Sequence, residues 1–428
     1  MILTVQKADF LSGSLRLAAS KSYSIRAFLI AACGGQSTIF YPSDCDDAKA
    51  AIDVAKILGA QIHSVRGEEF NVEAHAQSLK SKRINVRESA TVLRFLLPLL
   101  SLRANSAVVY GQGTLIGRPN VHLLNCLRSS GVEIEGSGPK ESVPITLKGG
   151  GLRSGVMTID GSLSSQFISS LLIAAPRLKE NSEIRLVGKK LVSSDYIKMT
   201  TLILNQAGVK IKKISARRYF IKGNQKFLGL KNFYVPSDYG LAAFLMAACA
   251  LTRSDVVLQG SFYDEFIQAD GRILGFLKKM GVVWTRTKDA IKIKGPFDLK
   301  GGVFSLRDCP DLVPIMAVLG LFAKGGVRLV DIAHARAKES DRVSDLRQEL
   351  LKVGACVQEK PDELKVFPLK KAREGVVLDP RHDHRLAMAF AVLGLKIGVT
   401  VKDIECVRKS YPQFVADIKK LGGPVKVL

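Results

Sequence analysis

The stretch Leu58-Gly59-Ala60-Gln61-Ile62 ends an apolar helical segment on a glycine and continues at once as a short, apolar, strand-like run. The same junction recurs at intervals of about 70 residues over the whole chain of 428 residues. The junctions are centred on Gly59, Gly131, Gly208, Gly281, Gly354 and Gly422. Glycine suits this place because a helix commonly closes on a left-handed residue, and only a residue without Cβ adopts that conformation cheaply. The sequence therefore predicts one supersecondary unit that is used six times.

A second series of segments keeps the same spacing but is apolar on nearly every side. These segments cover residues 27–32, 92–100, 167–175, 241–250, 312–322 and 386–395. A helix without a polar face has to be buried all round. Each repeat is therefore predicted to pair one buried helix with one amphipathic helix and to join the two by short strands.

The starts of the buried segments are strongly polar. In chain order they carry Ser20-Lys21-Ser22 with Arg26, Thr91 with Arg94, Ser164-Ser165-Gln166, Asp238, Asp311 and His384-Arg385. Parallel buried helices bring their N-termini to a common end, where free N–H groups and the helix dipole favour anions. N-capping explains Ser, Thr or Asp at any single helix. It does not explain the cations, which need partners when they are buried, and this end is therefore the predicted site.

Composition limits the class of protein. A hydrophobic content of 47% without low-complexity runs is typical of a folded chain, and 428 residues suffice for two domains of about 200 residues each. No stretch is apolar and uninterrupted enough to span a bilayer, and the N-terminus lacks the pattern of a signal peptide. The seven cysteines are scattered without a C-x-x-C pair, which indicates a reducing compartment. We expect a cytoplasmic protein that does not bind a membrane.

The formal net charge of +24 is compatible with binding of nucleic acid, and this class stays open as an alternative. No helix-turn-helix, zinc-finger or RNP motif accompanies the charge, and an aromatic content of 7% provides few stacking platforms. A basic funnel for small polyanions explains the charge as well. His382 and His384 lie close together without further ligand clusters, so we predict no metal site and no cofactor.

Four segments combine cations, hydroxyls and glycines in ways that suit phosphate or carboxylate. They are Ser20-Lys21-Ser22 with Arg26, the glycine-rich loop of residues 111–117 with Arg118 and Pro119 after it, Gly161-Ser162-Leu163-Ser164-Ser165-Gln166, and Ala337-Lys338-Glu339-Ser340-Asp341-Arg342. Asp383-His384-Arg385 and Arg408-Lys409-Ser410 add further charge.

Four segments resemble the signature segments of the 5-enolpyruvylshikimate-3-phosphate synthases, in that family's order and spacing, and the resemblance runs from about Lys21 to Ser410. They are Ser20-Lys21-Ser22 with Arg26, Ser164-Ser165-Gln166-Phe167, Lys338-Glu339-Ser340-Asp341-Arg342 and Asp383-His384-Arg385. The resemblance implies an α/β fold of two domains, each made of three βαβαββ repeats around buried parallel helices, an inside-out α/β barrel. It implies that residues 19–235 form the first domain and that residues 1–18 and 236–428 form the second. The active site is then expected in the cleft between the domains.

The implied reaction transfers the enolpyruvyl group of phosphoenolpyruvate to the 5-hydroxyl of shikimate 3-phosphate and releases phosphate, in the pathway to chorismate and the aromatic amino acids. Both substrates are small polyanions, and we expect a monomeric enzyme. The resemblance assigns phosphoenolpyruvate to Lys21, Ala90, Arg118, Gln166, Arg342, Arg385 and Lys409. It assigns shikimate 3-phosphate to Ser22, Arg26, Ser164, Ser165, Gln166, Ser193, Tyr196, Asp311 and Lys338.

The resemblance also implies the proton transfers. Asp311 takes the hydroxyl proton, and Glu339 delivers a proton to the methylene carbon, with Lys21 assisting. A carboxylate at the start of a buried helix needs a partner or a function. N-capping of that helix is the alternative role for Asp311.

The chain departs from the family pattern at three places. Ala18-Ala19 stand where the family has Pro-Gly, and Ile25 replaces a frequent Asn. Glu88-Ser89-Ala90-Thr91 replaces Asn-(Ser/Ala)-Gly-Thr, so Ala90 adds a methyl group to the donor wall and Glu88 adds negative charge near an anion site.

Three alternative functions stay open at this stage. The sister transferase acting on UDP-N-acetylglucosamine usually has a cysteine in the loop of residues 111–117, and this chain has none there. A basic nucleic-acid-binding or RNA-end-processing protein on a related repeat fold is the second alternative. An inactive relative, or a piece of a multifunctional aromatic-pathway polypeptide, is the third.

Overall fold

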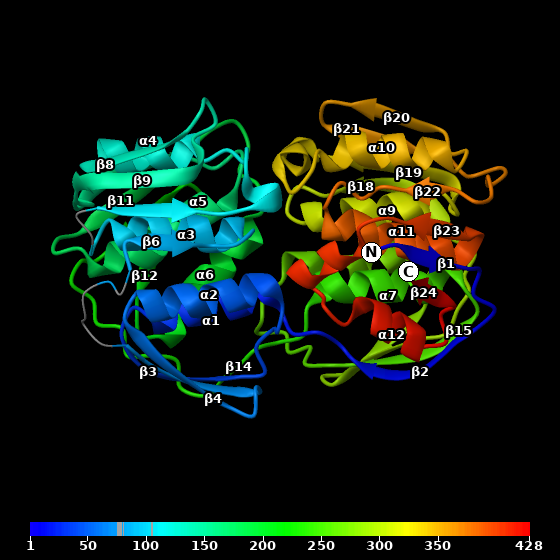
Figure 1. Cartoon of the computed structure of the whole chain (residues 1–428), viewed down its shortest axis with the longest axis horizontal. Helices are drawn as coiled ribbons and strands as arrows, with labels where there is room; N and C mark the ends of the chain where they lie inside the picture. Colours follow the sequence, from blue (N-terminus) through cyan, green and yellow to red (C-terminus); the bar gives the residue numbers. More distant parts are fainter. Residues whose placement is uncertain (75–78, 80, 104–105) are drawn as a thin grey trace. The chain divides into compact units, whose positions relative to one another are not determined.

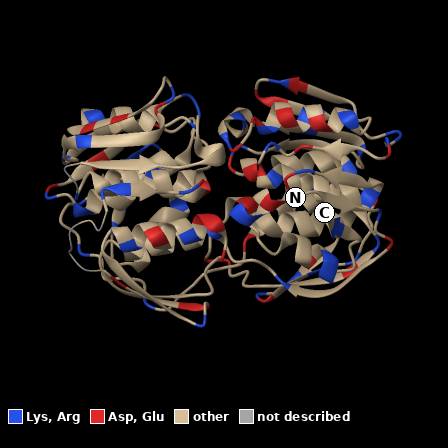
Figure 2. Cartoon of the chain, in the orientation of Figure 1, with Lys and Arg blue, Asp and Glu red and all other residues tan. Residues whose placement is uncertain are grey.

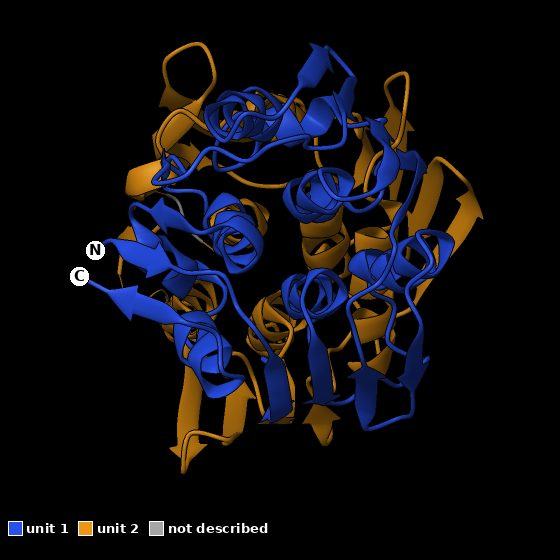
Figure 3. Cartoon of the chain, turned by 90° about the vertical axis from the view of Figure 1, so that its right-hand side faces the viewer, with its two compact units in different colours: residues 1–18, 236–428 blue, residues 19–235 orange. Residues whose placement is uncertain are grey.

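The computed structural model of the chain describes residues 1–74, 79, 81–103 and 106–428. The chain divides into two compact units, which Figure 3 shows in different colours. Unit 1 comprises Met1–Ala18 and Pro236–Leu428, and unit 2 comprises Ala19–Val235. Within each unit the helices lie inside and the strands lie around them (Figure 3).

Among its described residues, unit 2 contains three four-stranded sheets, and Figure 1 labels several of their strands. They are β14 (Phe233–Tyr234), β3 (Gly35–Phe40), β5 (Glu69–Ala74), β4 (Ala60–Val65); β6 (Arg83–Asn85), β7 (Ala107–Tyr110), β9 (Ser142–Gly150), β8 (Val132–Ser137); and β10 (Gly155–Asp160), β11 (Ser182–Val187), β13 (Arg218–Ile221), β12 (Ile211–Ser215).

Unit 1 contains another three sheets of the same kind. They are β16 (Trp284–Arg286), β17 (Ala290–Ile293), β15 (Ser254–Gln259), β2 (Leu11–Arg16); β18 (Lys300–Ser305), β19 (Lys324–Val330), β21 (Glu363–Val366), β20 (Val357–Lys360); and β22 (Val377–Leu378), β23 (Val399–Val401), β1 (Leu3–Val5), β24 (Val425–Val427).

The same pairing pattern is present in all six sheets. One outer strand pairs in parallel with its neighbour, as β10 does with β11, and the other two pairings are antiparallel. In each unit at least one sheet is completed by a strand from the far end of that unit's sequence. In unit 2, β14 pairs with β3, and in unit 1, β2 pairs with β15 and β1 pairs with both β23 and β24.

One buried and one amphipathic helix accompany each sheet. The buried helices are α1 (Lys21–Ala31), α3 (Ala90–Leu100), α5 (Ser165–Ala174), α7 (Tyr239–Leu251), α9 (Val313–Gly320) and α11 (His384–Ile397). The amphipathic helices are α2 (Asp46–Ile57), α4 (Val121–Ser129), α6 (Ser194–Gln206), α8 (Arg272–Lys279), α10 (Arg342–Lys352) and α12 (Phe414–Lys420). Every residue of α7 and of α9 is buried, as an all-apolar helix requires.

The junction glycines have the predicted conformation. Gly59, Gly131, Gly208, Gly281, Gly354 and Gly422 all have φ between +83° and +96° and follow the amphipathic helices α2, α4, α6, α8, α10 and α12. Each glycine therefore turns the chain from an amphipathic helix into an outer antiparallel strand of a sheet; the first five of these strands form hairpins, and β24 after Gly422 pairs with β1. The predicted α/β class and the sixfold repeat are confirmed.

Charged residues of both signs are spread over the elements of both units (Figure 2). On the outer face of β11 and β13, for example, Glu183 pairs with Arg185 and Arg218. Within the described ranges, no helix is both long and apolar enough to cross a membrane.

Candidate functional site

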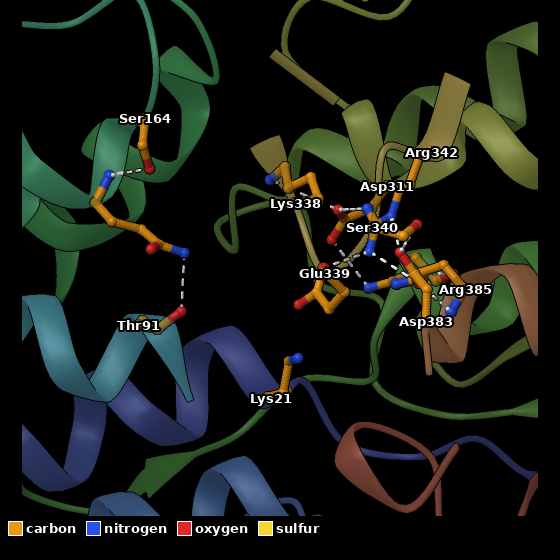
Figure 4. A network of polar contacts seen from close by, with 12 residues as sticks. Lys21, Thr91, Ser164, Asp311, Lys338, Glu339, Ser340, Arg342, Asp383 and Arg385 are labelled. Atoms are coloured by element: carbon orange, nitrogen blue, oxygen red, sulfur yellow. Dashed lines mark hydrogen bonds and ion pairs between the residues drawn. The ribbon is translucent and has the colours of Figure 1, made fainter. Parts of the chain in front are cut away.

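In unit 1, a cluster of charged side chains gathers where α9, α10 and α11 begin (Figure 4). Arg342 is the first residue of α10, Asp383 is the N-cap of α11, and Asp311 lies in a 3-10 turn (Pro310–Leu312) directly before α9. Asp311 and Arg342 follow two strand-to-helix connections of one repeat, whose strands form the β18-β19-β21-β20 sheet, and Asp383 follows a strand-to-helix connection of the next repeat.

Arg342 is the centre of this cluster and is only 1% exposed. Its guanidinium donates to Asp311 Oδ1 at 2.6 Å, to Glu339 Oε2 at 2.8 Å and to Asp383 Oδ2 at 2.7 Å. Burial alone lowers the pKa of Arg342, but Asp383, Glu339 and Asp311 outweigh it and hold that pKa well above its ordinary value. The guanidinium therefore stays charged and fixes three carboxylates from three segments.

Asp311 contacts two further cations. Arg385 Nη2 lies 3.2 Å from its Oδ2, and Lys338 Nζ lies 3.8 Å from its Oδ1. Burial raises the pKa of Asp311, but Arg385, Lys338 and Arg342 together hold it well below its ordinary value. The side chain makes no cap bond to the turn or helix that follows, so the N-capping role is wrong for Asp311.

The remaining members of the cluster position one another. Lys409 Nζ lies 3.7 Å from Glu339 Oε1. Asp383 accepts from Ser340 Oγ at 3.2 Å and, as N-cap, from the backbone N–H of Arg385 at 2.8 Å. Residues 338–341 are not helical, and α10 begins only at Arg342. Glu339 therefore contacts Arg342 from the segment before the helix.

Two further carboxylates, those of Asp238 and Asp270, lie near Arg385 around Gly240. Arg385 Nη1 donates to the carbonyl oxygen of Gly240 at 2.8 Å. A Cβ atom at Gly240 would collide with Asp270 Oδ2 and would lie 2.8 Å from Arg385 Nη1 and 3.1 Å from Asp238 Oδ1. Burial, followed by Asp311, raises the pKa of Asp270 to about 7, although Arg385 opposes this. Glycine is therefore required at position 240 for Asp238, Asp270 and Arg385 to approach one another.

Glu349 of α10 anchors the segment that leads into α11. Its carboxylate is fully buried, and it accepts from Lys352 Nζ at 2.6 Å and from the backbone N–H of Asp379 at 2.8 Å. Arg381 Nη2 lies 3.5 Å away. Helix α10 thus holds the segment before Arg385 through Arg342 at one end and Glu349 at the other.

In unit 2, Lys21 and Arg26 lie on the first turns of α1. Lys21 Nζ pairs at 3.0 Å with Asp47, which is buried in the first turn of α2. Arg26 is 1% exposed and donates to Thr200 Oγ1 at 2.9 Å, to the Ser22 carbonyl at 3.0 Å and to the Tyr196 carbonyl at 3.4 Å. Burial lowers the pKa of Arg26 to about 10, which still leaves it charged at neutral pH.

A second network in unit 2 joins α3 to α5 (Figure 4). Gln166 Nε2 donates to Thr91 Oγ1 at 2.9 Å, and Arg94 Nη1 donates to Gln166 Oε1 at 2.7 Å. Ser164 caps α5 through the backbone N–H of Gln166, and Ser165 is buried beside it. The amide of Gln166 is thereby fixed in one orientation.

The other residues assigned in unit 2 lie at loop and helix starts. Ser193 has a left-handed backbone (φ 55°) and is the N-cap of α6, with Tyr196 in the first turn of that helix. Ala90 is the first residue of α3, and Arg118 is 6% exposed after the glycine-rich loop. Ile25 is fully buried in α1.

The sequence assignments fall into two groups, one in each unit. Asp311, Lys338, Glu339, Arg342, Arg385 and Lys409 lie together in unit 1, and the remaining assigned residues lie at the N-terminal ends of α1, α3, α5 and α6 and at the loop before α4 in unit 2. Sequence reasoning missed Asp47, Asp270 and Glu349. They are acids on amphipathic helices or turns, and nothing local distinguishes them from solvated acids.

No metal site is evident. Over the part of the chain that the structure describes, no group of three or more His, Cys, Asp or Glu side chains could hold a metal ion. The cluster of unit 1 is instead built from alternating carboxylates and cations, an arrangement that suits binding of anions and transfer of protons.

A family model and full-length relatives that carry the same name match this chain in sequence. The chain matches the family model of EPSP synthase (3-phosphoshikimate 1-carboxyvinyltransferase) over residues 5–418. It is 34% identical over 436 residues to the 3-phosphoshikimate 1-carboxyvinyltransferase of Methanococcus aeolicus, with 100% of both chains covered. It is 36% identical over 431 residues to the protein of that name from Methanocaldococcus jannaschii, with 100% of this chain and 99% of the relative covered.

Solved structures show the same fold. The EPSP synthase of Acinetobacter baumannii matches with a TM-score of 0.79 and 24% identity, and the match covers 99% of each chain. The enolpyruvyl transferase NikO of Streptomyces tendae matches with a TM-score of 0.77 and 19% identity, covering 99% of this chain and 98% of the other. The family match and the full-length relatives go beyond the fold, and this chain belongs to the EPSP synthase family.

Proposed function

We propose that this chain is a 3-phosphoshikimate 1-carboxyvinyltransferase. It transfers the enolpyruvyl group of phosphoenolpyruvate to the 5-hydroxyl of shikimate 3-phosphate, releases phosphate and serves aromatic amino-acid biosynthesis. Family membership over residues 5–418 supports this reaction. The observation that carries the proposal is the Asp311–Arg342–Glu339 cluster, because it holds a candidate base and a candidate acid on one cation.

The cations of the cluster would bind the donor. Arg342, Arg385 and Lys409 are assigned to phosphoenolpyruvate, and each contacts a carboxylate in this structure. An incoming phosphate or carboxylate group would take over part of these contacts. Charge-assisted hydrogen bonds to arginine are strong and are often bidentate, so this exchange is favourable.

Donor binding would then activate the base. Asp311 has its pKa held well below the ordinary value by Arg385, Lys338 and Arg342, and a carboxylate in that state is a weak proton acceptor. When an anionic donor shares Arg342 and Arg385, the pKa of Asp311 rises toward the value that proton abstraction needs. Asp311 would thus be an effective proton acceptor only when the donor is bound.

The proton balance follows from these roles. Asp311 takes the proton of the 5-hydroxyl as its oxygen attacks the donor carbon. Glu339 protonates the methylene carbon, which gives a tetrahedral intermediate with a methyl group. In the elimination step the Glu339 carboxylate takes back a proton from the methyl group, and phosphate leaves with the proton that Asp311 received from the hydroxyl, which restores the double bond and both side chains.

Unit 2 would supply the rest of the substrate contacts. Lys21, Arg118 and Gln166 are proposed for phosphoenolpyruvate and Ala90 for the wall of its pocket. The proposed ligands of shikimate 3-phosphate in this unit are Ser22, Arg26, Ser164, Ser165, Gln166, Ser193 and Tyr196, together with Asp311 and Lys338 of unit 1. The proposal therefore treats residues 19–235 and residues 1–18 with 236–428 as two domains whose residues act on one pair of substrates in a shared cleft.

Release of phosphate tests the function directly. Purified protein should release phosphate from phosphoenolpyruvate when shikimate 3-phosphate is present, and not when UDP-N-acetylglucosamine replaces it. Asp311→Asn and Glu339→Gln should each lower kcat by about 10²- to 10⁴-fold, the usual contribution of a positioned base or acid. Release with the UDP-sugar alone would contradict the proposal.

We further propose a cytoplasmic monomer. The described cysteines are all free thiols, which is usual in a reducing compartment. Light scattering in solution should give the mass of a single chain, 46.5 kDa, and twice that mass would refute this part of the proposal.

A further inference from the structure

Glu88 contacts the glycine-rich loop that precedes Arg118. Its Oε2 accepts from the backbone N–H of Thr114 at 3.2 Å and from Thr114 Oγ1 at 3.0 Å. Thr114 is the middle residue of a 3-10 turn, Gly113–Leu115. A single carboxylate therefore satisfies both a backbone and a side-chain donor of this turn.

The loop backbone fits closely against residues 87 and 88. Gln112 N donates to the Arg87 carbonyl at 2.9 Å. A Cβ atom at Gly111 would lie 2.7 Å from the same carbonyl oxygen, and one at Gly113 would collide with Glu88 Oε1. Glycine at these two positions lets the loop approach Glu88.

The far end of the loop is fixed independently. Gly117 N donates to Ser142 Oγ at 2.6 Å, and Asn120 Nδ2 donates to the Arg118 carbonyl at 3.1 Å. Between these anchors and the Arg87 carbonyl, the turn at Gly113–Leu115 is held by Glu88. Loss of the Glu88 contacts would therefore release the middle of the loop and leave both ends attached.

Glu88 also adjoins the start of α3. The next residue, Ser89, is the N-cap of that helix and accepts from Val92 N at 3.4 Å. Thr91 and Arg94 on the first turns of α3 hold Gln166. Glu88 thus connects the segment that orients Gln166 to the loop that ends at Arg118.

We propose that Glu88 is a positioning residue of the phosphoenolpyruvate site, which holds the 111–117 loop against the start of α3 so that Arg118 and Gln166 keep a fixed separation. This inference rests on the proposed function, because it takes Arg118 and Gln166 as donor ligands. The sequence alone shows Glu88 only as added negative charge near an anion site, and the contacts with Thr114 give this charge a role. The carboxylate is engaged by Thr114, and its effect on the donor is supportive.

Three variants separate the two roles of Glu88. Glu88→Ala should raise the KM for phosphoenolpyruvate by about tenfold, as expected for loss of hydrogen bonds to a charged acceptor, and should change kcat and the KM for shikimate 3-phosphate by less than about twofold. Glu88→Gln should recover most of the affinity, because its amide oxygen still accepts from Thr114. Thr114→Val should raise the same KM by less than Glu88→Ala does, and should add nothing in the double variant.

A repulsive role of Glu88 predicts a change of the KM for phosphoenolpyruvate in the opposite direction. If Glu88 acted by repulsion, both Glu88→Ala and Glu88→Gln would lower the KM for phosphoenolpyruvate. Glu133→Ala is the matched control, since it removes the charge of an exposed glutamate from the same unit and should leave every constant unchanged. A lowered KM in both Glu88 variants, or an unchanged KM in Glu88→Ala, would overturn the proposal.

Hydrogen exchange keeps this inference separate from the reaction itself. Amides of residues 112–116 should exchange faster in Glu88→Ala than in the wild-type protein, with the rest of unit 2 unchanged. The faster exchange is expected even if the wild-type protein transfers no enolpyruvyl group. In that case the proposed function fails, and the inference that Glu88 holds the 111–117 loop stands. Unchanged exchange of these amides in Glu88→Ala would overturn the inference that Glu88 holds the loop, whatever the enzymatic activity.

Discussion

At the scale of single residues, the cluster of unit 1 balances burial against charge. Arg342 is nearly inaccessible and touches three carboxylates, so its removal would leave Asp311, Glu339 and Asp383 short of a partner. Breaking a buried ion pair from one side is more costly than its net stabilising value, because the remaining charge stays buried. The site is therefore expected to be sensitive in stability as well as in activity.

Arg342→Met tests this expectation. We expect the free energy of unfolding to fall by about 3–5 kcal/mol, the usual penalty for breaking a buried pair from one side, as measured by urea denaturation. Arg185→Met removes an exposed arginine that pairs with Glu183 and should cost less than about 1 kcal/mol. Equal effects of the two substitutions would contradict the buried-charge argument.

Asp270 gives a prediction for pH. Its pKa is about 7 in the folded chain against an ordinary 3.8, and Asp311, Arg385, Asp238 and Lys338 are the charged groups that act on it. Between these two values the folded state binds more protons at Asp270 than the unfolded state does, so this contribution to stability is complete below about pH 4 and is lost as the pH rises through about 7.

Asp270→Asn should remove that dependence. One pKa unit corresponds to about 1.4 kcal/mol, so between pH 5 and pH 8 the free energy of unfolding of the wild type should fall by more than about 1 kcal/mol relative to the variant. Urea denaturation at several pH values measures the difference. Parallel pH profiles for both proteins would show that Asp270 does not titrate in this range.

At the scale of elements, α10 controls the segment that precedes α11. Arg342 at its start and Glu349 two turns later both bond to residues 379–383, which end at the N-cap of α11. Arg385 follows directly and depends on that cap for its position. Helix α10 therefore positions Arg385, a proposed ligand of the donor, although Arg385 belongs to α11.

Glu349→Gln should disturb that control without touching the substrates. Loss of the charge weakens the bonds to Lys352 and Arg381, so we expect the KM for phosphoenolpyruvate to rise several-fold while the KM for shikimate 3-phosphate stays within about twofold. Steady-state kinetics with each substrate varied in turn would measure this. Glu374→Gln, an exposed change in the nearby segment, is the control and should have no effect.

Prediction from sequence was most successful for features that depend on local physics. The left-handed glycines after the amphipathic helices and the all-apolar helices could be read from the chain, since a Cβ clash and an absent polar face act within a few residues. The charged starts of the helices indicated the site. The partners of those charges could not be read, because Lys21 meets Asp47 and Arg385 meets Asp311 through tertiary packing. The role of Glu88 could not be read for the same reason, since its partner Thr114 lies 26 residues away in sequence.

At the scale of the whole molecule, the two units differ in how their sheets are completed. All twelve strands of the three sheets of unit 2 lie within Ala19–Val235. In unit 1, by contrast, β1 and β2 come from the first 18 residues and complete sheets that are otherwise built from residues after Pro236. The second piece of the chain is therefore not complete on its own.

Separate expression of the two pieces tests this asymmetry. Residues 19–235 should fold alone and melt cooperatively in calorimetry, because every sheet and buried helix of unit 2 is present. Residues 236–428 should not, because β15, β23 and β24 lose pairing partners. Joining residues 1–18 after residue 428 through a short linker should restore cooperative melting, since Ile2 and Leu428 already exchange backbone hydrogen bonds. A cooperative transition for residues 236–428 alone would contradict this prediction.

The pairing of β1 with β24 also has a consequence for synthesis on the ribosome. Strand β1 leaves the exit tunnel well before its partner β24, and at about 5–20 residues per second it waits for on the order of 20–80 s. During that interval unit 2 can fold, while the N-terminal segment stays without its sheet. Nascent chains stalled at increasing lengths should therefore protect residues 19–235 from protease long before they protect residues 1–18, and unit 1 is complete only after β24 has been translated.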